Sequence, residues 1–230
     1  MAVTEATTLE LQRRRRADLS FVRGLASFAR QKPLGAAGGA ILLLTVLVAA
    51  AAPYLAPSDP LALRVAHRFE PPGTQFLLGT DKFGRDVLSR VIYGARISLW
   101  VGIVAVGIGT GVGSVIGVIS GYAGGRVDLA VQRAMDALLA FPTLILAITI
   151  TAAMGISTTN TMVAIGIVMM PQVARVVRSA ALTVKEHQFV EAARAVGCGH
   201  LRIVLRHVVP NVAAPIIVIA TAGLGSAILT

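Results

Sequence analysis

Apolar residues fill long stretches of this chain, and charged residues fall between them. Four runs carry no charged side chain: residues 33–58, 97–125, 137–174 and 208–230. A helix needs roughly 20 apolar residues to cross a bilayer, and the third run is almost twice as long, with a polar break at 157–160. The pattern predicts an all-α polytopic membrane helix bundle with five spans, at about residues 34–55, 97–121, 131–155, 161–180 and 210–230.

The composition agrees with a place in the membrane. Hydrophobic residues make up 55% of the chain, charged residues make up 14%, and the mean hydropathy is +0.77. These values lie outside the usual range of soluble domains. The net charge of +10 requires no nucleic acid, because basic residues beside membrane helices bind anionic headgroups and set the topology.

Basic residues also predict the orientation, since short cytoplasmic loops are enriched in Lys and Arg. The tail of residues 1–33, the 122–130 link and the 181–209 segment carry basic residues, whereas residues 156–160 carry none. We therefore expect the N-terminus and the two basic segments in the cytoplasm. The long 56–96 segment, which is also slightly basic, is expected outside with residues 156–160.

The first apolar helix follows a basic tail, as a cleavable signal peptide would. Its apolar run is longer than an ordinary signal core, so we expect an uncleaved helix at 34–55. Prolines and glycines after it predict an irregular external loop. At the end of the 56–96 segment, the apolar side chains of residues 85–96 share one helical face, which predicts a helix lying at the membrane interface.

Glycines recur at every fourth position along the second predicted span, at Gly109, Gly113, Gly117 and Gly121. This spacing leaves a smooth strip on one helix face, where another backbone can approach closely. We expect a helix-packing surface there. The pattern leaves open whether the neighbouring helix belongs to this chain or to a partner.

The sequence contains no recognisable catalytic or metal-binding constellation. It has no Gly-rich nucleotide loop, and no ligand cluster surrounds Cys198, the single cysteine. We expect a non-catalytic chain that binds no metal or cofactor itself. Almost no ionisable group lies within the spans, which disfavours an ion-coupled carrier. Arg133 and Asp136, at the inner end of the third span, are expected to act as interfacial anchors, and their i,i+3 spacing allows them to pair with each other.

A polar island, residues 186–211, separates the last two spans. Its pattern predicts a helix that ends at Gly197 and a second, basic helix after the turn. Ala192 and Ala193 keep the surface of the first helix shallow, and Glu191 offers a charge to a basic partner. We interpret the island as a docking surface.

At this point the island resembles a known motif. Glu191-Ala192-Ala193, followed by Gly197 and by Pro210 at a bend, is similar to the EAA loop of permease subunits of binding-protein-dependent ABC importers. In that family the loop, here residues 182–210, forms a coupling helix that docks in a groove of a cytosolic ATPase. His207 departs from the broad motif, which often has a hydrophobic residue there. The resemblance implies that the ATPase-coupling residues are Phe189, Glu191, Ala192, Ala193, Arg194, Gly197, His200 and Pro210.

Three separate stretches, residues 78–99, 121–128 and 138–142, resemble the C-type permease of dipeptide, oligopeptide and nickel importers. The resemblance implies an inner-membrane permease domain over 97–230 that forms the translocation path as a heterodimer with a homologous permease. Two ABC ATPase subunits would bind ATP and Mg, and an extracytoplasmic binding protein would deliver the solute, with di- or oligopeptides favoured. Because the family has a sixth span, we expect a C-terminally truncated version.

The sequence also permits other interpretations. Within the same branch, the solute could be nickel or another small solute. In a different class, the chain could be an ATP-independent carrier or a structural membrane protein, and co-purification with a P-loop ATPase would argue against both. A DNA-binding helix-turn-helix within the island is disfavoured by the membrane spans on either side.

Overall fold

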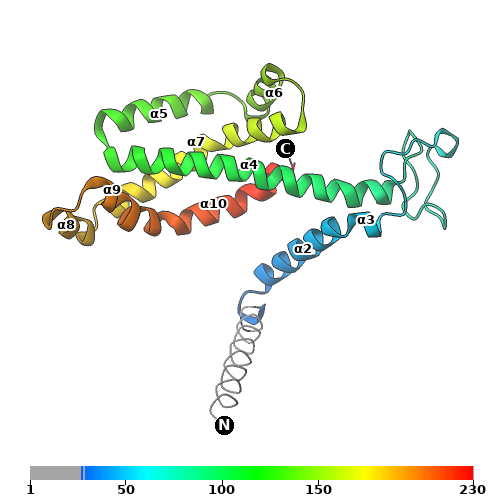
Figure 1. Ribbon diagram of the computed structural model, residues 1–230, viewed down its shortest axis with the longest axis horizontal. Helices are drawn as coiled ribbons and strands as arrows, with labels where there is room; N and C mark the ends of the chain where they lie inside the picture. Colours follow the sequence, from blue (N-terminus) through cyan, green and yellow to red (C-terminus); the bar gives the residue numbers. More distant parts are fainter. Residues whose placement is uncertain (1–26, 28, 230) are drawn as a thin grey trace, which may run out of the picture. The chain divides into compact units, whose positions relative to one another are not determined.

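The computed structural model describes residue 27 and residues 29–229; most of the basic tail lies outside this part. The described residues are mainly helical (Figure 1), and the β-type pairing among them is one isolated bridge between Thr80 and Asp86. The predicted all-α membrane helix bundle is confirmed. The described residues divide into two compact units, with the division between Arg96 and Ile97.

The first unit contains α2 (Pro33–Ala50), the short α3 (Ala52–Leu55), the 3-10 turn η1 (Val65–His67) and the beginning of α4 (Val87–Ala123). Pro33 occupies the first position of α2, where a helix needs no backbone N–H. The large apolar side chains of α2 are exposed around the helix, and such a surface suits lipid. α2 and α3 together cover the predicted first span.

α4 is one helix of 37 residues. At 1.5 Å per residue it is about 55 Å long, which exceeds the ~30 Å hydrocarbon core of a bilayer. The prediction of a separate interfacial helix at 85–96 is therefore wrong, since Val87 begins α4 itself. The stretch contains no proline, and Gly94 costs only about 1 kcal/mol of helix stability, so nothing in the sequence ends the helix there.

The second unit continues α4 and adds α5 (Gly125–Leu139), α6 (Thr143–Met154), α7 (Thr158–Lys185), α8 (Gln188–Ala195), α9 (His200–Ile203), the π-helical turn η2 (Val204–Val208) and α10 (Val209–Leu229). Among the described residues, four helical stretches are long and apolar enough to cross a membrane: α2, α4, α7 and His200–Ile228. α7 packs against α5, α6 and α10 and so occupies a central place in the unit.

The predicted third span, at 131–155, is bent. α5 and α6 are long and apolar enough to cross a membrane only when taken together, and their axes differ by 93°. The chain turns before Pro142, which precedes the first residue of α6 in an extended conformation (ψ 131°). A proline disfavours helical geometry in the residue before it and cannot donate a backbone hydrogen bond, so this position is a suitable place for the break.

The glycine strip of α4 lies against α7. A Cβ atom added to Gly109, Gly113, Gly117 or Gly121 would come within 2.5–2.9 Å of a backbone carbonyl oxygen of α7. Real Cβ atoms do not approach that closely, so the two backbones are in direct contact only because these residues have no side chain. The neighbouring helix therefore belongs to this chain.

Candidate functional site

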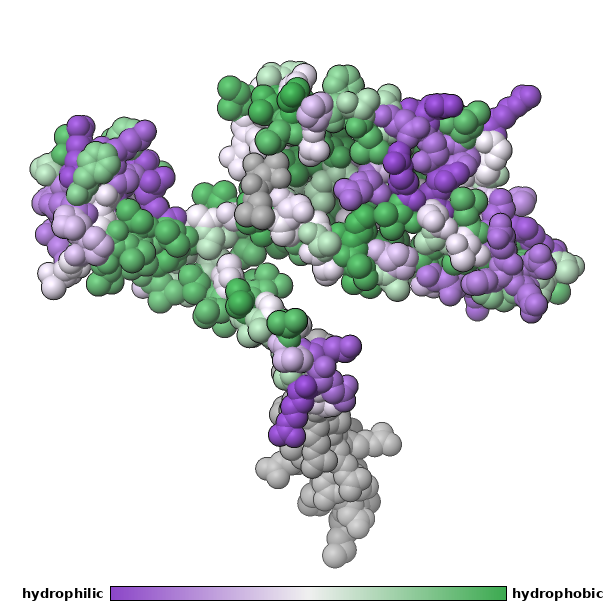
Figure 2. Space-filling view, turned by 180° about the vertical axis from the view of Figure 1, so that it is seen from behind, coloured by the Kyte–Doolittle hydropathy of each residue, from purple (hydrophilic) through white to green (hydrophobic). Residues whose placement is uncertain are grey.

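The polar island folds as α8, a turn and α9, followed by η2 and α10. Figure 2 shows mainly hydrophilic residues at the end of the second unit that carries this segment, in contrast to the apolar patches elsewhere on the unit. α8 has two unlike faces. Val190 is fully buried, whereas Phe189, Glu191 and Arg194 are exposed.

The buried face of α8 continues the core of the helix bundle. One apolar cluster joins residues from α4, α7, α8, α9, η2 and α10: Val118, Val173, Val177, Ala181, Val184, Val190, Ala193, Ile203, Val208 and Val212. Because interiors of this kind are close-packed, a displacement of α8 presses directly on its neighbours. The cluster thus connects the polar island to three membrane-length helices, α4, α7 and α10.

Ala193 lies in this cluster and is only 8% exposed. It therefore faces the chain's own core and not the exposed docking surface on which the sequence pattern placed it. A short amphipathic helix must turn one side toward the bundle, and Ala193 is three residues from Val190 on that side. Ala192 is exposed and remains on the outer face.

Gly197 ends α8 in a left-handed conformation, with φ at +82°. Its N–H donates to the Arg194 carbonyl at 2.9 Å, and the Cys198 N–H donates to the Ala193 carbonyl at 3.0 Å. These two bonds form a Schellman motif, in which glycine is preferred because it has no Cβ. Cys198 then packs on the apolar cluster, which explains a small apolar residue at this place.

The outer face of α8 carries Glu191 within its first helical turn. A carboxylate near a helix N-terminus is favoured by the helix dipole. Within residues 29–229, no ion pair joins Glu191 to a basic side chain of the chain itself. Its charge is therefore available to a partner.

Phe189 lies between two histidines. Its ring centroid is 5.4 Å from that of His187 and 6.1 Å from that of His207, and the side chain is 40% exposed. His207 belongs to η2, so this contact links the beginning of α8 to the π-helical turn. The histidine that departs from the family motif thus has a packing partner inside the island.

Pro210 is the second residue of α10, one residue after the end of η2. A proline donates no backbone hydrogen bond, so the helical ladder loses a bond there. One residue further on, the Asn211 side-chain amide donates to the His207 carbonyl at 2.7 Å. Ile203 and Val208 are fully buried around this turn, which holds it against the bundle.

His200 and Arg194 both contact Tyr122 near the end of α4. The Tyr122 hydroxyl lies 2.9 Å from Nδ1 of His200, and the Arg194 guanidinium lies 5.9 Å from the centre of the Tyr122 ring. From the sequence pattern, Tyr122 had no predicted role beyond its place in the 121–128 stretch, because His200 and Arg194 lie more than 70 residues further along the chain.

A second polar cluster joins α5 to α7. The Arg178 guanidinium makes two bonds to the Asp128 carboxylate, and the Ser120 hydroxyl of α4 donates to the same group at 2.5 Å. Asp136 pairs with Arg175 of α7 at 2.6 Å, and not with Arg133, with which its spacing would have allowed it to pair. A rule based on spacing along one helix identifies only partners within that helix, so it could not identify Arg175 on α7.

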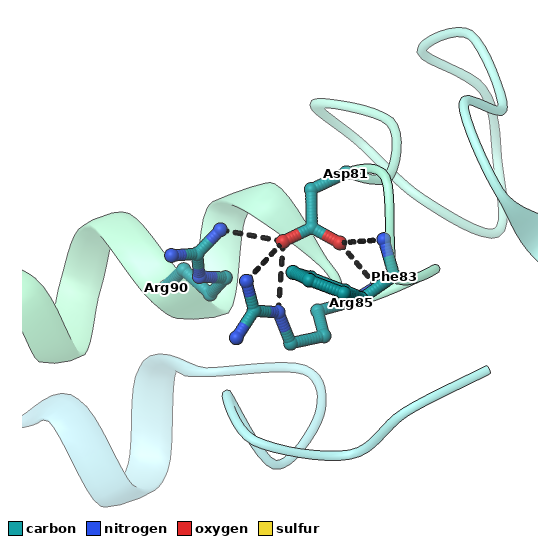
Figure 3. A network of polar contacts seen from close by, with 4 residues as sticks. All are labelled: Asp81, Phe83, Arg85 and Arg90. Carbon is teal, nitrogen blue, oxygen red and sulfur yellow. Dashed lines mark hydrogen bonds and ion pairs between the residues drawn. The ribbon is translucent and has the colours of Figure 1, made fainter. Parts of the chain in front are cut away.

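In the first unit, the loop after α3 is organised by Asp81 (Figure 3). Its carboxylate accepts bonds from the backbone N–H groups of Phe83 and Arg85 and from the guanidinium groups of Arg85 and Arg90. Partial removal of water raises the pKa of Asp81, but these hydrogen bonds outweigh it and lower the pKa from 3.8 to about 2. The loop is irregular, as predicted, and these bonds hold it in a defined conformation.

Between α6, α7 and α10 a hollow of about 230 Å³ is lined mainly by apolar side chains, with a few polar groups that include Thr143 and Gln172. It lies in the second unit and not in the island. Within the described part of the chain, no group of three metal-ligating side chains occurs.

The fold and these features define a multi-pass helical membrane protein with one structured polar helix–turn–helix between two membrane-length helices. The family model described as binding-protein-dependent transport system inner membrane component matches residues 113–230, and the model for the N-terminal TM domain of oligopeptide transport permease C matches residues 28–72. The chain belongs to the family of binding-protein-dependent transport system inner membrane components.

Curated relatives agree with this assignment. A dipeptide transport system permease protein of Alkalihalophilus pseudofirmus is 41% identical over 200 residues, which cover 87% of this chain and 66% of that protein. A di/tripeptide transport system permease protein of Pseudomonas aeruginosa is 42% identical over 88% of this chain and 69% of that protein. A Brucella suis relative, named for a peptide transport system permease, is 42% identical over 84% of this chain. The chain spans 64% of that relative's length.

Proposed function

We propose that this chain is a permease subunit of an ATP-driven importer for di- or oligopeptides. It would form the translocation path with a homologous permease, and two cytosolic ABC ATPase subunits would bind ATP and Mg. An extracytoplasmic binding protein would deliver the solute. The two-faced α8 carries the proposal: Glu191 on its outer face is free for a partner, while Val190 on its inner face belongs to the bundle core.

The mechanism follows from that arrangement. Closure of the ATPases would push α8, and the apolar cluster would pass the movement to α7 and α10, because packed side chains shift together. Rotation of those helices would then alternate access to the path. The hollow between α6, α7 and α10 supports a path on that side of the unit. The chain itself would make and break no covalent bond.

The choice of peptide rests on the relatives. Their names refer to dipeptides, to di- and tripeptides and, for a Pectobacterium atrosepticum permease that is 37% identical, to glutathione, which is itself a small peptide. The alternative solute remains nickel or another small molecule of the same branch. Within the system, the binding protein would make much of the selection.

The proposed orientation places the N-terminus and the island in the cytoplasm. The basic residues of the 122–130 and 181–209 segments support it, since Lys and Arg favour the cytoplasmic side of short loops. This side is also where ATPase subunits would find α8.

The proposal is tested in proteoliposomes that hold the complete complex, with peptide uptake and ATP hydrolysis measured together. Glu191→Ala should lower the peptide taken up per ATP hydrolysed, because the ATPase loses a charged contact on α8. Glu186→Ala is the matched control, since Glu186 is exposed in the turn before α8. Unchanged coupling in Glu191→Ala, or uptake without any ATPase subunit, would refute the proposal.

A further inference from the structure

Tyr122 occupies a special place in the second unit. It lies in the last turn of α4, and its ring meets side chains from three other elements. The hydroxyl is 2.9 Å from Nδ1 of His200 in α9, and the two rings meet edge to face with centroids 5.9 Å apart. Lys185 at the end of α7 and Arg194 of α8 lie 5.8 and 5.9 Å from the ring centre.

These contacts combine two kinds of attraction. A cation within about 6 Å of an aromatic face is attracted by the ring quadrupole, and Lys185 and Arg194 both meet that distance. The hydrogen bond to His200 fixes the direction of the ring. Its apolar part also packs on the cluster that contains Val190, so Tyr122 is anchored on the side of the bundle as well as on the side of the island.

The order of the helices along the chain explains why the contacts of Tyr122 matter. α8 and α9 follow α7 and precede α10, so a movement of α8 reaches those two helices through the backbone. α4 has no such link, because more than 60 residues separate Tyr122 from α8. The Tyr122 ring supplies a direct contact between α4 and the island, and the glycine strip holds α4 against α7.

We infer that Tyr122 is a positioning residue of the coupling machinery: it holds α8 and the start of α9 against α4, so that the three move as one body when the ATPase moves α8. This inference rests on the proposed function. The inference predicts that the aromatic ring is essential for coupling, because Lys185 and Arg194 contact the ring. The hydroxyl, which contacts His200, should make a smaller contribution to coupling.

The test uses the complete complex in proteoliposomes with three variants. Tyr122→Leu should lower peptide uptake per ATP by at least ~5-fold, the lower range of measured allosteric couplings. Tyr122→Phe keeps the ring and should retain most of the coupling. Tyr93→Leu, at the opposite end of the same helix, is the control and should behave like the wild type.

A distance measurement separates positioning from a general loss of fold. Spin labels at Ala123→Cys and Ala195→Cys, both exposed sites, are introduced in a Cys198→Ser background. Their distance distribution should stay narrow through the ATP cycle in wild type and Tyr122→Phe, and broaden in Tyr122→Leu. Wild-type coupling in Tyr122→Leu would overturn the inference if Glu191→Ala still uncouples. If both variants couple normally, the proposed function itself fails.

Discussion

Arg178 and Asp128 face each other across α7 and α5 as a two-bond pair, with Nε to Oδ1 and Nη2 to Oδ2 each at 2.5 Å. Parallel bonds between a guanidinium and a carboxylate fix both distance and direction. The Ser120 hydroxyl donates to the same carboxylate, and Gln132 donates to Ser120 at 3.0 Å. Through this network α4, α5 and α7 are held together at one end of the unit.

Asp128→Asn should destabilise the protein. The substitution removes the charge that balances Arg178, and a hydrogen bond to a charged group is worth about 1.5–3 kcal/mol. We expect a loss near 2 kcal/mol, measured by unfolding in detergent. Asp136→Asn is the control, because its ion pair with Arg175 is about half exposed and exposed pairs contribute about 1 kcal/mol or less. Equal losses in both variants would contradict the prediction.

Gly117→Ala should weaken the contact between α4 and α7. The added Cβ would lie 2.5 Å from the Ala174 carbonyl oxygen, and such overpacking typically costs about 1–3 kcal/mol. Gly111→Ala, on the same helix but with open space around it, should be neutral or slightly stabilising, since alanine favours a helix. Thermal unfolding of both variants compares the two positions. A Gly117→Ala protein as stable as Gly111→Ala would show that the helices separate easily.

Gly197→Ala should loosen the end of α8. An alanine forced into the left-handed conformation costs about 1–2 kcal/mol, although no neighbouring atom would touch its Cβ. Faster hydrogen exchange at the Cys198 amide, which donates to Ala193, would report the change. Gly199→Ala should leave that rate unchanged, because Gly199 has φ at −65° and open space around it. In Gly197→Asn the exchange rate of the Cys198 amide should lie between those of Gly197→Ala and Gly199→Ala, since asparagine tolerates the left-handed conformation better than alanine.

Asp81 makes the loop after α3 sensitive to acid. Its pKa falls from 3.8 to about 2 in the folded loop, so its contribution to stability is present above pH 3.8 and is lost as the pH falls toward 2. Cleavage of the loop by pepsin should therefore increase across this window in the wild type. In Asp81→Asn, pepsin should cleave the loop readily at every pH in this window, with no acid-dependent increase.

The control for that experiment is Asp59→Asn. Asp59 is exposed and accepts a bond from the nearby Leu61 N–H, outside the Asp81 network. This variant should keep the acid-dependent step of the wild type. If Asp81→Asn instead shows the same acid-dependent increase in cleavage as the wild type, the response belongs to a different carboxylate of the loop.

The sequence by itself determined that this is a helical membrane protein, that a polar island separates two apolar helices, and that Gly197 ends α8. Each of these follows from properties read within a few neighbouring residues: hydropathy over about one span length, helical periodicity and the backbone preference of glycine. The glycine spacing in α4 likewise marked a close contact surface before its partner was known.

Only the tertiary structure decided which side chains meet. It paired Asp136 with Arg175 and not with Arg133, turned Ala193 into the core, joined Tyr122 to His200, and continued α4 through the predicted interfacial segment. These outcomes depend on the rotation and crossing of whole helices, which are set by packing between residues far apart in the chain. Local hydropathy does not encode that geometry. The sequence pattern could therefore locate the island, but its contacts depend on how the helices pack.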